Sequence, residues 1–287
     1  MNRANASGAK QLWRFVKTFG RMSKKTTFPH DISAQDLSNY FAGVYGSESL
    51  SNLDDFSCLM SDLPSISVRV TVYEVEFLLN HMRKKSPGPD GIPAWVMKDM
   101  SYCIAPAVTH IFNRSLNEAH VPVCLKEALI SPIPKKTKPS SCDDFRPISL
   151  LPLLSKVLEK LVLQYWFLPF VKSIDSNQFA YIPRPGSGCM SALTLLQHYV
   201  LNHLDSRSGA VRLLSLDFSK AFDTLPHASI VKSCIQRRIP IQAVKWVANY
   251  LRDRRQRVVL GDSFSSWHSP HSGVPQGSIL GPILFAV

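Results

Sequence analysis

Several features are missing from this sequence of 287 residues, and each absence argues against a class of protein. The six cysteines are dispersed and never form a CxxC pair, which argues against a zinc knuckle or zinc ribbon. No apolar run is long enough to span a bilayer, because the most hydrophobic region, residues 148–171, is interrupted by charged side chains. No signal-peptide pattern opens the chain. We therefore expect no zinc and no membrane partner, and an intracellular protein of the nucleus or cytoplasm with reduced cysteines.

Acidic residues are also scarce, with 21 Asp and Glu against 33 Lys and Arg, so the formal net charge is +12. This excess favours a polyanionic partner such as nucleic acid, although exposed lysines alone can produce the same balance. Residues 1–30 carry basic charges and no acid, and fit either a basic nucleic-acid-binding arm or a solvated helix. We expect three regions: a basic extension and linker over 1–65, a second region over 66–205, and a third over 206–287.

Periodicity and capping signals predict most of the secondary structure. Thr71 and Glu74 fit a capping box that opens a helix with an apolar stripe. Further helices are expected over 36–45, 92–120, 155–168, 191–204, 228–238 and 242–252, with Pro169 ending the third of these. Residues 128–134 and 144–150 predict a hairpin whose first strand is a proline-bearing edge strand. A second hairpin is expected to turn at Gly261 and Asp262.

Residues 213–223 are the stretch around which the sequence is organised. The apolar run from Leu213 to Leu216 reads as a short strand buried on both faces, and it ends on Asp217. A carboxylate at the end of a buried strand must meet a cation or a hydrogen-bond network. Asp223 follows on a turn, and we interpret it as a structural cap rather than a metal ligand.

Three basic segments each leave two interpretations open. Residues 84–91 form a cation-flanked Pro-Gly-rich turn that could hold a phosphate or simply join two helices. The loop at 135–138 with Arg146 on the following strand suits a triphosphate, or is a solvated hairpin tip. The arginines of residues 252–257 form either a charged helix end or a contact with a nucleic-acid backbone.

Taken in order, six blocks of the sequence resemble the reverse transcriptase domain of non-LTR (LINE-type, CR1/Jockey-like) retrotransposons. They lie at residues 84–93, 132–136, 145–150, 178–181, 216–223 and 273–278. The resemblance implies an α+β right-hand polymerase, helix-rich and without a thumb. Residues 66–205 would form its fingers-type region, and residues 206–287 an incomplete palm with a small antiparallel sheet. It also implies two-metal nucleotidyl transfer with Mg²⁺, using an RNA template, a DNA primer and deoxynucleoside triphosphates.

The same resemblance assigns roles to individual residues. Asp217 matches the catalytic, metal-binding carboxylate, and the carbonyl of Phe218 would complete the metal shell. Phe222 matches the bulky residue under the nucleotide sugar, and Gln276 the residue beside the incoming nucleotide. The remaining assignments are Arg146 with Lys135 or Lys136 on the triphosphate, and Lys84, Lys85, Gly88 and Gly91 near the template strand.

One element of that family is absent from these 287 residues, namely an aromatic-Ala-Asp-Asp turn after residues 273–278. Because two metals need more carboxylate than Asp217 provides, we expect this polypeptide alone to be inactive, with apolar palm surface exposed. The alternatives are a non-catalytic, basic nucleic-acid-binding fragment and a relic of a mobile element without selected function.

Overall fold

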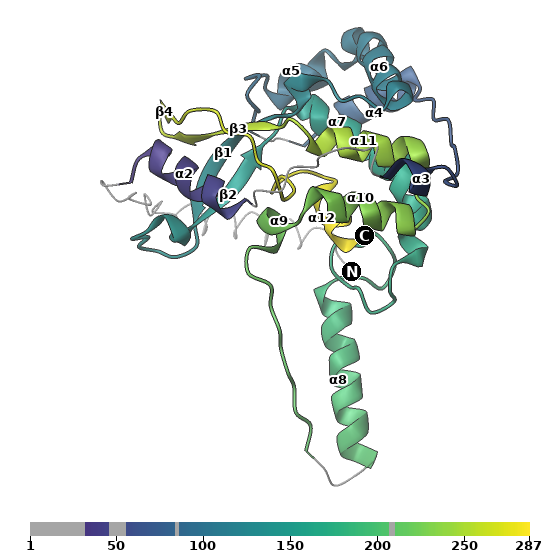
Figure 1. Cartoon of the computed structure of the whole chain (residues 1–287), viewed down its shortest axis with the longest axis vertical. Coiled ribbons are helices and arrows are strands. Elements are labelled where there is room, and N and C mark those ends of the chain that lie inside the picture. The colour runs from purple at the N-terminus through teal and green to yellow at the C-terminus, as the bar shows by residue number, and fades with distance from the viewer. Residues whose placement is uncertain (1–31, 46–55, 84–85, 207–209) are drawn as a thin grey trace, which may run out of the picture.

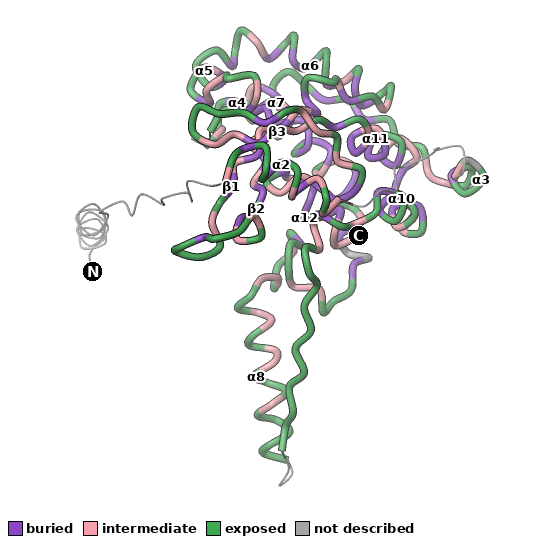
Figure 2. The backbone as a smooth tube through the Cα atoms, turned by 60° about the vertical axis from the view of Figure 1, so that its left-hand side comes forward, coloured by how far each residue is buried: buried purple, intermediate pink, exposed green. Residues whose placement is uncertain are grey.

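The computed structural model describes residues 32–45, 56–83, 86–206 and 210–287 (Figure 1). The basic segment 1–30 and the first half of the expected linker, residues 46–55, lie outside these residues. The described part combines many helices with a four-stranded sheet, which confirms a mixed α and β class. One helix, α8, projects from the main body together with the chain that returns beside it (Figures 1 and 2).

The helices are α2 (Ala34–Val44), α3 (Ser57–Met60), α4 (Val72–Asn80), α5 (Ala94–Asp99), α6 (Ser101–Glu118), α7 (Leu153–Val162), α8 (Cys189–Ser206), α9 (Ala221–Thr224), α10 (His227–Gln236), α11 (Ile241–Leu251) and α12 (Gly281–Ala286). The expected helices are present with small shifts at their ends, except that residues 92–120 form two helices, α5 and α6, on either side of Met100. The short helices α3, α9 and α12 were not expected. The capping box of α4 is confirmed, since Thr71 Oγ1 accepts from the Glu74 amide and Glu74 Oε2 accepts from the Thr71 amide.

Pro169 does not end the helix in which it was expected to act as a stop. The α-helical part already ends at Val162, and a π-turn over Leu163–Phe167 leads into a 3-10 helix over Leu168–Ser173. Pro169 lies in the first turn of that 3-10 helix. An N–H group has no helical partner at this position, so proline costs little there.

The sheet has the order β2-β1-β3-β4, with β1 at Glu127–Pro134, β2 at Phe145–Leu150, β3 at Arg255–Leu260 and β4 at Ser263–Phe264. Both expected hairpins, β1–β2 and β3–β4, are confirmed as antiparallel pairs. β1 and β3 run parallel, a pairing that the sequence did not predict.

The interpretation of β1 as an edge strand is wrong, since β1 lies between β2 and β3. β3 pairs only with residues 127–130, the first half of β1. Pro132 and Pro134 lie beyond that half, so their missing N–H groups remove no bond to β3. A strand that contains prolines can therefore be internal where its second neighbour pairs only with the part that has no proline.

Two apolar clusters hold the body together. The larger one gathers side chains of α4, α6, α7, the π-helical turn after α7, α10 and α11, among them the fully buried Phe112, Trp166, Trp246 and Tyr250. The smaller one packs α2 against one face of the sheet through Leu37, Phe41, Ile130 and Val258. Figure 2 shows the buried chain concentrated in this body. No described helix has the length and apolar character needed to cross a bilayer.

The strand expected at residues 213–216 is not formed, so that prediction is wrong. Residues 210–218 are extended but unpaired, and Leu214 and Leu216 are 81% and 85% exposed. A strand is buried only when its N–H and C=O groups find partners, and no described strand lies beside this segment. α8 likewise has no buried residue, so apolar surface is exposed here, as expected (Figure 2).

Candidate functional site

A cavity of about 540 Å³ lies where four separate parts of the chain meet. α2 forms one wall and the β1–β2 hairpin another, while residues 217–223 and Gln276 complete the lining. Six of the residues assigned from the sequence line this one space: Lys135, Arg146, Asp217, Phe218, Phe222 and Gln276. Folding therefore brings together side chains from three segments that are far apart in the sequence.

Gln276 is fixed in this cavity by Asp223. Its Nε2 atom donates to both carboxylate oxygens of Asp223, at 2.8 Å each. Burial raises the pKa of Asp223, and the hydrogen bonds from Gln276 act in the opposite direction. The interpretation of Asp223 as a helix cap is wrong, because it lies inside α9 and its carboxylate holds Gln276 instead.

Two glycines allow the loop around Gln276 to approach its neighbours. Gly273 has φ +77°, and a Cβ atom there would lie 2.6 Å from the carbonyl oxygens of Phe222 and Asp223. A Cβ atom on Gly277 would lie 2.7 Å from the carbonyl oxygen of Ser149. Only residues without a side chain permit this approach. The loop is consequently docked on both α9 and β2.

A buried carboxylate holds the chain just after Gln276. Glu159 of α7 is fully buried, and its Oε2 accepts from the amides of Ile279 and Leu280 at 2.6 and 3.2 Å. Burial raises the pKa of Glu159, while the two amides favour its ionised form. Sequence reasoning treated this residue only as a charge in a hydrophobic region, and its positioning role was missed.

Two lysines of the cavity face one carboxylate. Nζ of Lys135 and Nζ of Lys220 each lie 3.6 Å from Asp143 Oδ1. The Tyr40 hydroxyl donates to the same oxygen at 2.5 Å and accepts from Lys220 Nζ at 2.7 Å. Lys220 Nζ also lies 4.7 Å from the centre of the Tyr40 ring. The hydrogen bond to Tyr40 raises the pKa of Lys220.

Lys136 belongs to a different arrangement from Lys135. Its Nζ lies 2.8 Å from Asp144 Oδ2, which also accepts from the amides of Ser140 and Ser141. The bond from Lys136 holds the pKa of Asp144 well below its usual range. Lys136 does not line the cavity. The structure thereby separates two lysines that the sequence left as alternatives.

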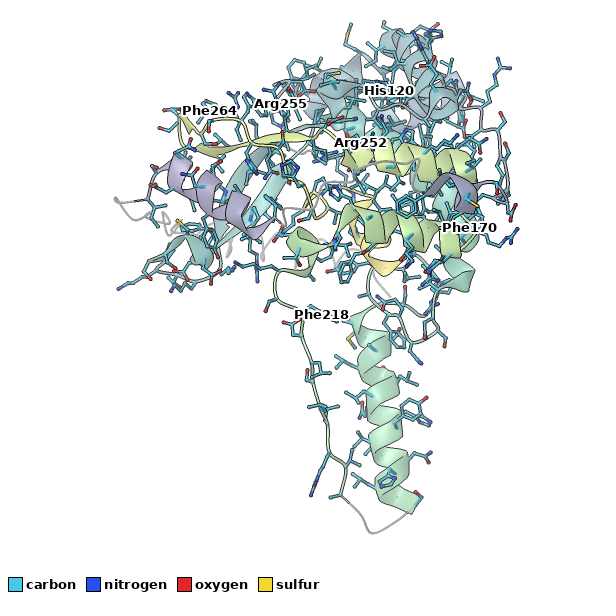
Figure 3. All side chains as sticks on the ribbon, viewed as in Figure 1. His120, Phe170, Phe218, Arg252, Arg255 and Phe264 are labelled. Atoms are coloured by element: carbon cyan, nitrogen blue, oxygen red, sulfur yellow. The ribbon has the colours of Figure 1, made fainter. Side chains whose placement is uncertain are left out.

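Asp217 and Phe218 lie on the extended segment where it reaches the cavity (Figure 3). Both are exposed, with Phe218 at 81%, and Asp217 Oδ1 accepts from the Phe218 amide at 2.9 Å. The expected burial of Asp217 on a strand is wrong. Phe222 is half-buried, and its ring lies 5.6 Å from that of Tyr181 and 4.9 Å from that of Phe285.

Few carboxylates of this cavity are free to bind Mg²⁺. Within the part of the chain that the structure describes, no group of three or more His, Cys, Asp or Glu could hold a metal ion. Asp143 and Asp223 already accept hydrogen bonds from Tyr40 and Gln276. Asp217 remains as an exposed carboxylate, which suits a Mg²⁺ ion that also takes phosphate oxygens and water as ligands.

The glycine-rich turn lies outside the cavity lining. Lys84 and Lys85 fall outside the described residues. Gly88 is buried, and a Cβ atom there would lie 2.5 Å from the Pro152 nitrogen. Gly91 has φ +64° and donates its amide to the Gly88 carbonyl at 3.1 Å, which closes the turn. Close packing against Pro152 therefore explains why residue 88 is a glycine, and no ligand is needed to account for it.

Sequence reasoning did not find Tyr40, Asp143 or Lys220. Lys220 stood in the same block as Asp217, so its place beside the carboxylate was a usable signal. Asp143 forms an Asp-Asp pair with Asp144, but the pair lacks the aromatic-Ala context expected of the family. Tyr40 belongs to an amphipathic stripe of α2, and nothing in that pattern distinguishes a cavity-lining ring from a core residue.

Most residues that line the cavity fall within a match to a known protein family. The family described as "Reverse transcriptase (RNA-dependent DNA polymerase)" matches residues 133–287, more than half of the chain. This range contains every residue that lines the cavity except those at positions 40–45. The chain belongs to the reverse transcriptase family.

The relatives are polymerases of non-LTR retrotransposons, which confirms the resemblance to a LINE-type reverse transcriptase domain. The RNA-directed DNA polymerase from mobile element jockey of Drosophila melanogaster is 29% identical over 99% of this chain and 33% of its own length. The probable RNA-directed DNA polymerase from transposon BS of the same species is 30% identical over 80% of this chain and 25% of its own. The chain thus spans about a third or less of these relatives.

Proposed function

We propose that this chain forms the nucleotide-binding part of an RNA-directed DNA polymerase, with the β1–β2 hairpin as fingers and residues 217–223 and 273–278 as palm. The substrates would be deoxynucleoside triphosphates, an RNA template and a DNA primer. The observation that carries the proposal is that Lys135, Arg146, Asp217, Phe222 and Gln276 line one cavity, although they come from three segments.

The charges of the cavity suit a triphosphate. The side chain of Arg146 is exposed and has no ion pair or hydrogen bond with the described residues, so its planar guanidinium group is available for two phosphate oxygens. Lys135 and Lys220 add two further positive charges. Mg²⁺ would neutralise phosphate charge beside Asp217. The Phe222 ring would lie under the sugar, where it excludes a ribose 2′-hydroxyl.

Binding and turnover make separate demands on this site. Asp217 is the one cavity carboxylate among the described residues that no other side chain engages. We therefore expect this polypeptide to bind nucleotide without incorporating it. A primer-extension assay on an RNA template with Mg²⁺ or Mn²⁺ tests this, and incorporation that disappears in Asp217→Ala would contradict it.

Nucleotide binding itself is tested by displacement of a fluorescent deoxynucleoside triphosphate. Arg146→Ala and Lys135→Ala should each weaken binding about tenfold, since each removes a charge-assisted contact. Lys98→Ala, which removes an exposed lysine of α5, is the matched control and should leave the affinity unchanged. Equal affinities of all four proteins would refute the proposed site.

A further inference from the structure

Two arginines of β3, Arg255 and Arg257, lie on the face of the sheet opposite α2. Val258 of β3 is buried in the cluster under α2, and Gln256 donates to the Tyr45 hydroxyl at 2.9 Å on the same side. Side chains alternate along a strand, so Arg255 and Arg257 point to the other face. Figure 3 labels Arg255 on β3 and Phe264 on β4 of the same hairpin.

Aromatic rings meet both guanidinium groups on this face. The Arg257 group lies 4.4 Å from the centre of the Phe264 ring and 4.7 Å from that of Trp267. The guanidinium group of Arg255 lies 5.1 Å from the centre of the same Trp267 ring. The four side chains alternate as Phe264, Arg257, Trp267 and Arg255, and we call them the Arg–aromatic strip.

The strip keeps binding capacity that the described residues do not use. Phe264 is 51% exposed, although a large apolar ring is normally covered. Arg257 Nε is buried and has no hydrogen-bond partner among the described residues. Arg255 has an exposed side chain that forms a loose ion pair with Glu127, at 3.7 Å, longer than a hydrogen bond. An exposed aromatic ring and an exposed arginine thus occur together.

The outer face of the sheet connects the strip to the cavity. In the register of the sheet, Arg257 lies opposite Leu129 of β1, and Arg146 lies opposite Ile133 of the same strand. Leu129 and Ile133 share one face of β1 and are separated by roughly 13 Å of strand. Ile133 is 46% exposed. A partly apolar, basic path therefore runs from the strip to Arg146.

We infer that the Arg–aromatic strip binds an unpaired nucleic-acid strand, with a base stacked on Phe264 and phosphates on Arg255 and Arg257. Every base has a flat face that stacks on an aromatic ring, and arginine pairs with phosphate oxygens at any sequence. The net charge of +12 favours the same partner. The inference rests on the proposed function only for naming this strand as the template, because binding at the strip requires neither nucleotide nor metal ion.

Fluorescence anisotropy of a labelled twelve-nucleotide oligouridylate, in EDTA and without nucleotide, measures this binding on the full chain. Phe264→Ala should weaken it at least fivefold, and Phe264→Leu should weaken it similarly while keeping apolar packing. Arg255→Gln should weaken it and reduce the slope of log affinity against log salt by about 0.7. Tyr102→Ala and Arg114→Gln, both exposed on α6, are the matched controls and should have no effect.

Three outcomes overturn the inference: equal losses in Phe264→Ala and Tyr102→Ala, full affinity in Phe264→Leu, or an unchanged salt slope in Arg255→Gln. A parallel titration with oligothymidylate shows whether the strip prefers RNA to DNA. A parallel titration with an RNA duplex should give weaker binding than the oligouridylate, because paired bases cannot stack on Phe264. The variants of the strip should keep wild-type nucleotide affinity. A chain that binds oligouridylate through Phe264 but binds no nucleotide would refute the proposed function and leave the strip intact.

Discussion

The side-chain amide of Gln276 donates to both carboxylate oxygens of Asp223, each at 2.8 Å, across 53 residues of sequence. This contact joins the loop of residues 273–278 to α9. It fixes which way the Gln276 amide points, because a carboxylate accepts only from the NH₂ group. The orientation of the residue proposed to lie beside the nucleotide is therefore set by Asp223.

Gln276→Glu should lower the free energy of unfolding by about 2 kcal/mol or more, because two carboxylates would face each other at a partly buried site. Adding Asp223→Asn should restore much of the loss, since the new amide can donate to the new carboxylate. Urea unfolding of the two single variants and the double variant measures this coupling. Additive losses in the double variant would show that the contact is unimportant.

Asp143 should compete with a bound triphosphate for Lys135 and Lys220. Asp143→Asn removes that negative charge and should tighten nucleotide binding severalfold. Tyr40→Phe keeps the ring but removes the hydroxyl that holds Lys220, and should weaken binding. Displacement titrations of both variants provide the measurement. Asp144→Asn is the control, because its partner Lys136 lies outside the cavity lining, and a similar gain there would contradict this account.

Gly88 and Gly91 should differ sharply in their tolerance of a side chain. Gly88→Ala forces a Cβ atom to 2.5 Å from backbone and should cost about 2 kcal/mol or more of stability. Gly91→Ala meets no neighbouring atom and should cost only the left-handed conformation, about 1 kcal/mol. Thermal unfolding of both variants distinguishes them. Equal, small losses would favour the interpretation of both glycines as ligand-binding positions.

His227 should make stability depend on pH. Its ring is buried with Nε2 2.8 Å from the Gly273 carbonyl oxygen, and burial lowers its pKa from 6.5. The unfolded chain therefore takes up a proton that the folded chain resists, so this contribution is fully present above about pH 6.5 and is lost as the pH falls. Arg254 and His271 act in the same direction.

Urea unfolding at pH 7.5 and 5.5 tests this, with His227→Gln as the comparison, because glutamine can still donate to Gly273 but does not titrate. The wild-type protein should lose more stability on acidification than His227→Gln. His268, whose pKa burial also lowers, is present in both proteins and cancels in the difference. An equal or larger loss in the variant would exclude His227 as a source of the pH dependence.

Local signals in the sequence predicted the elements of the fold better than their arrangement. The capping box at Thr71 and the turn at Gly261 depend on neighbouring residues, and both were confirmed. The strand at Leu213–Leu216 failed because a strand requires a partner, and an apolar run carries no information about one. β1 became internal because β3, more than a hundred residues later, pairs with it.

In the candidate site too, the sequence predicted individual residues better than their arrangement. The family blocks identified Asp217, Phe222, Arg146 and Gln276, and the structure brings these four together around one cavity. Which of Lys135 and Lys136 faces the cavity depends on the position of Asp143 and Asp144, which only the folded hairpin determines. Tyr40 lies on α2, far from every block, and its contact with Lys220 exists only in three dimensions.

The central claim is that Asp217 and the cations of the cavity bind a deoxynucleoside triphosphate together with Mg²⁺. Its most direct test is the nucleotide affinity with Mg²⁺ and with EDTA, measured for the wild-type chain and for Asp217→Asn. We predict that Mg²⁺ tightens binding to the wild-type chain severalfold and has a much smaller effect on the variant. The same Mg²⁺ dependence in both proteins would contradict the claim.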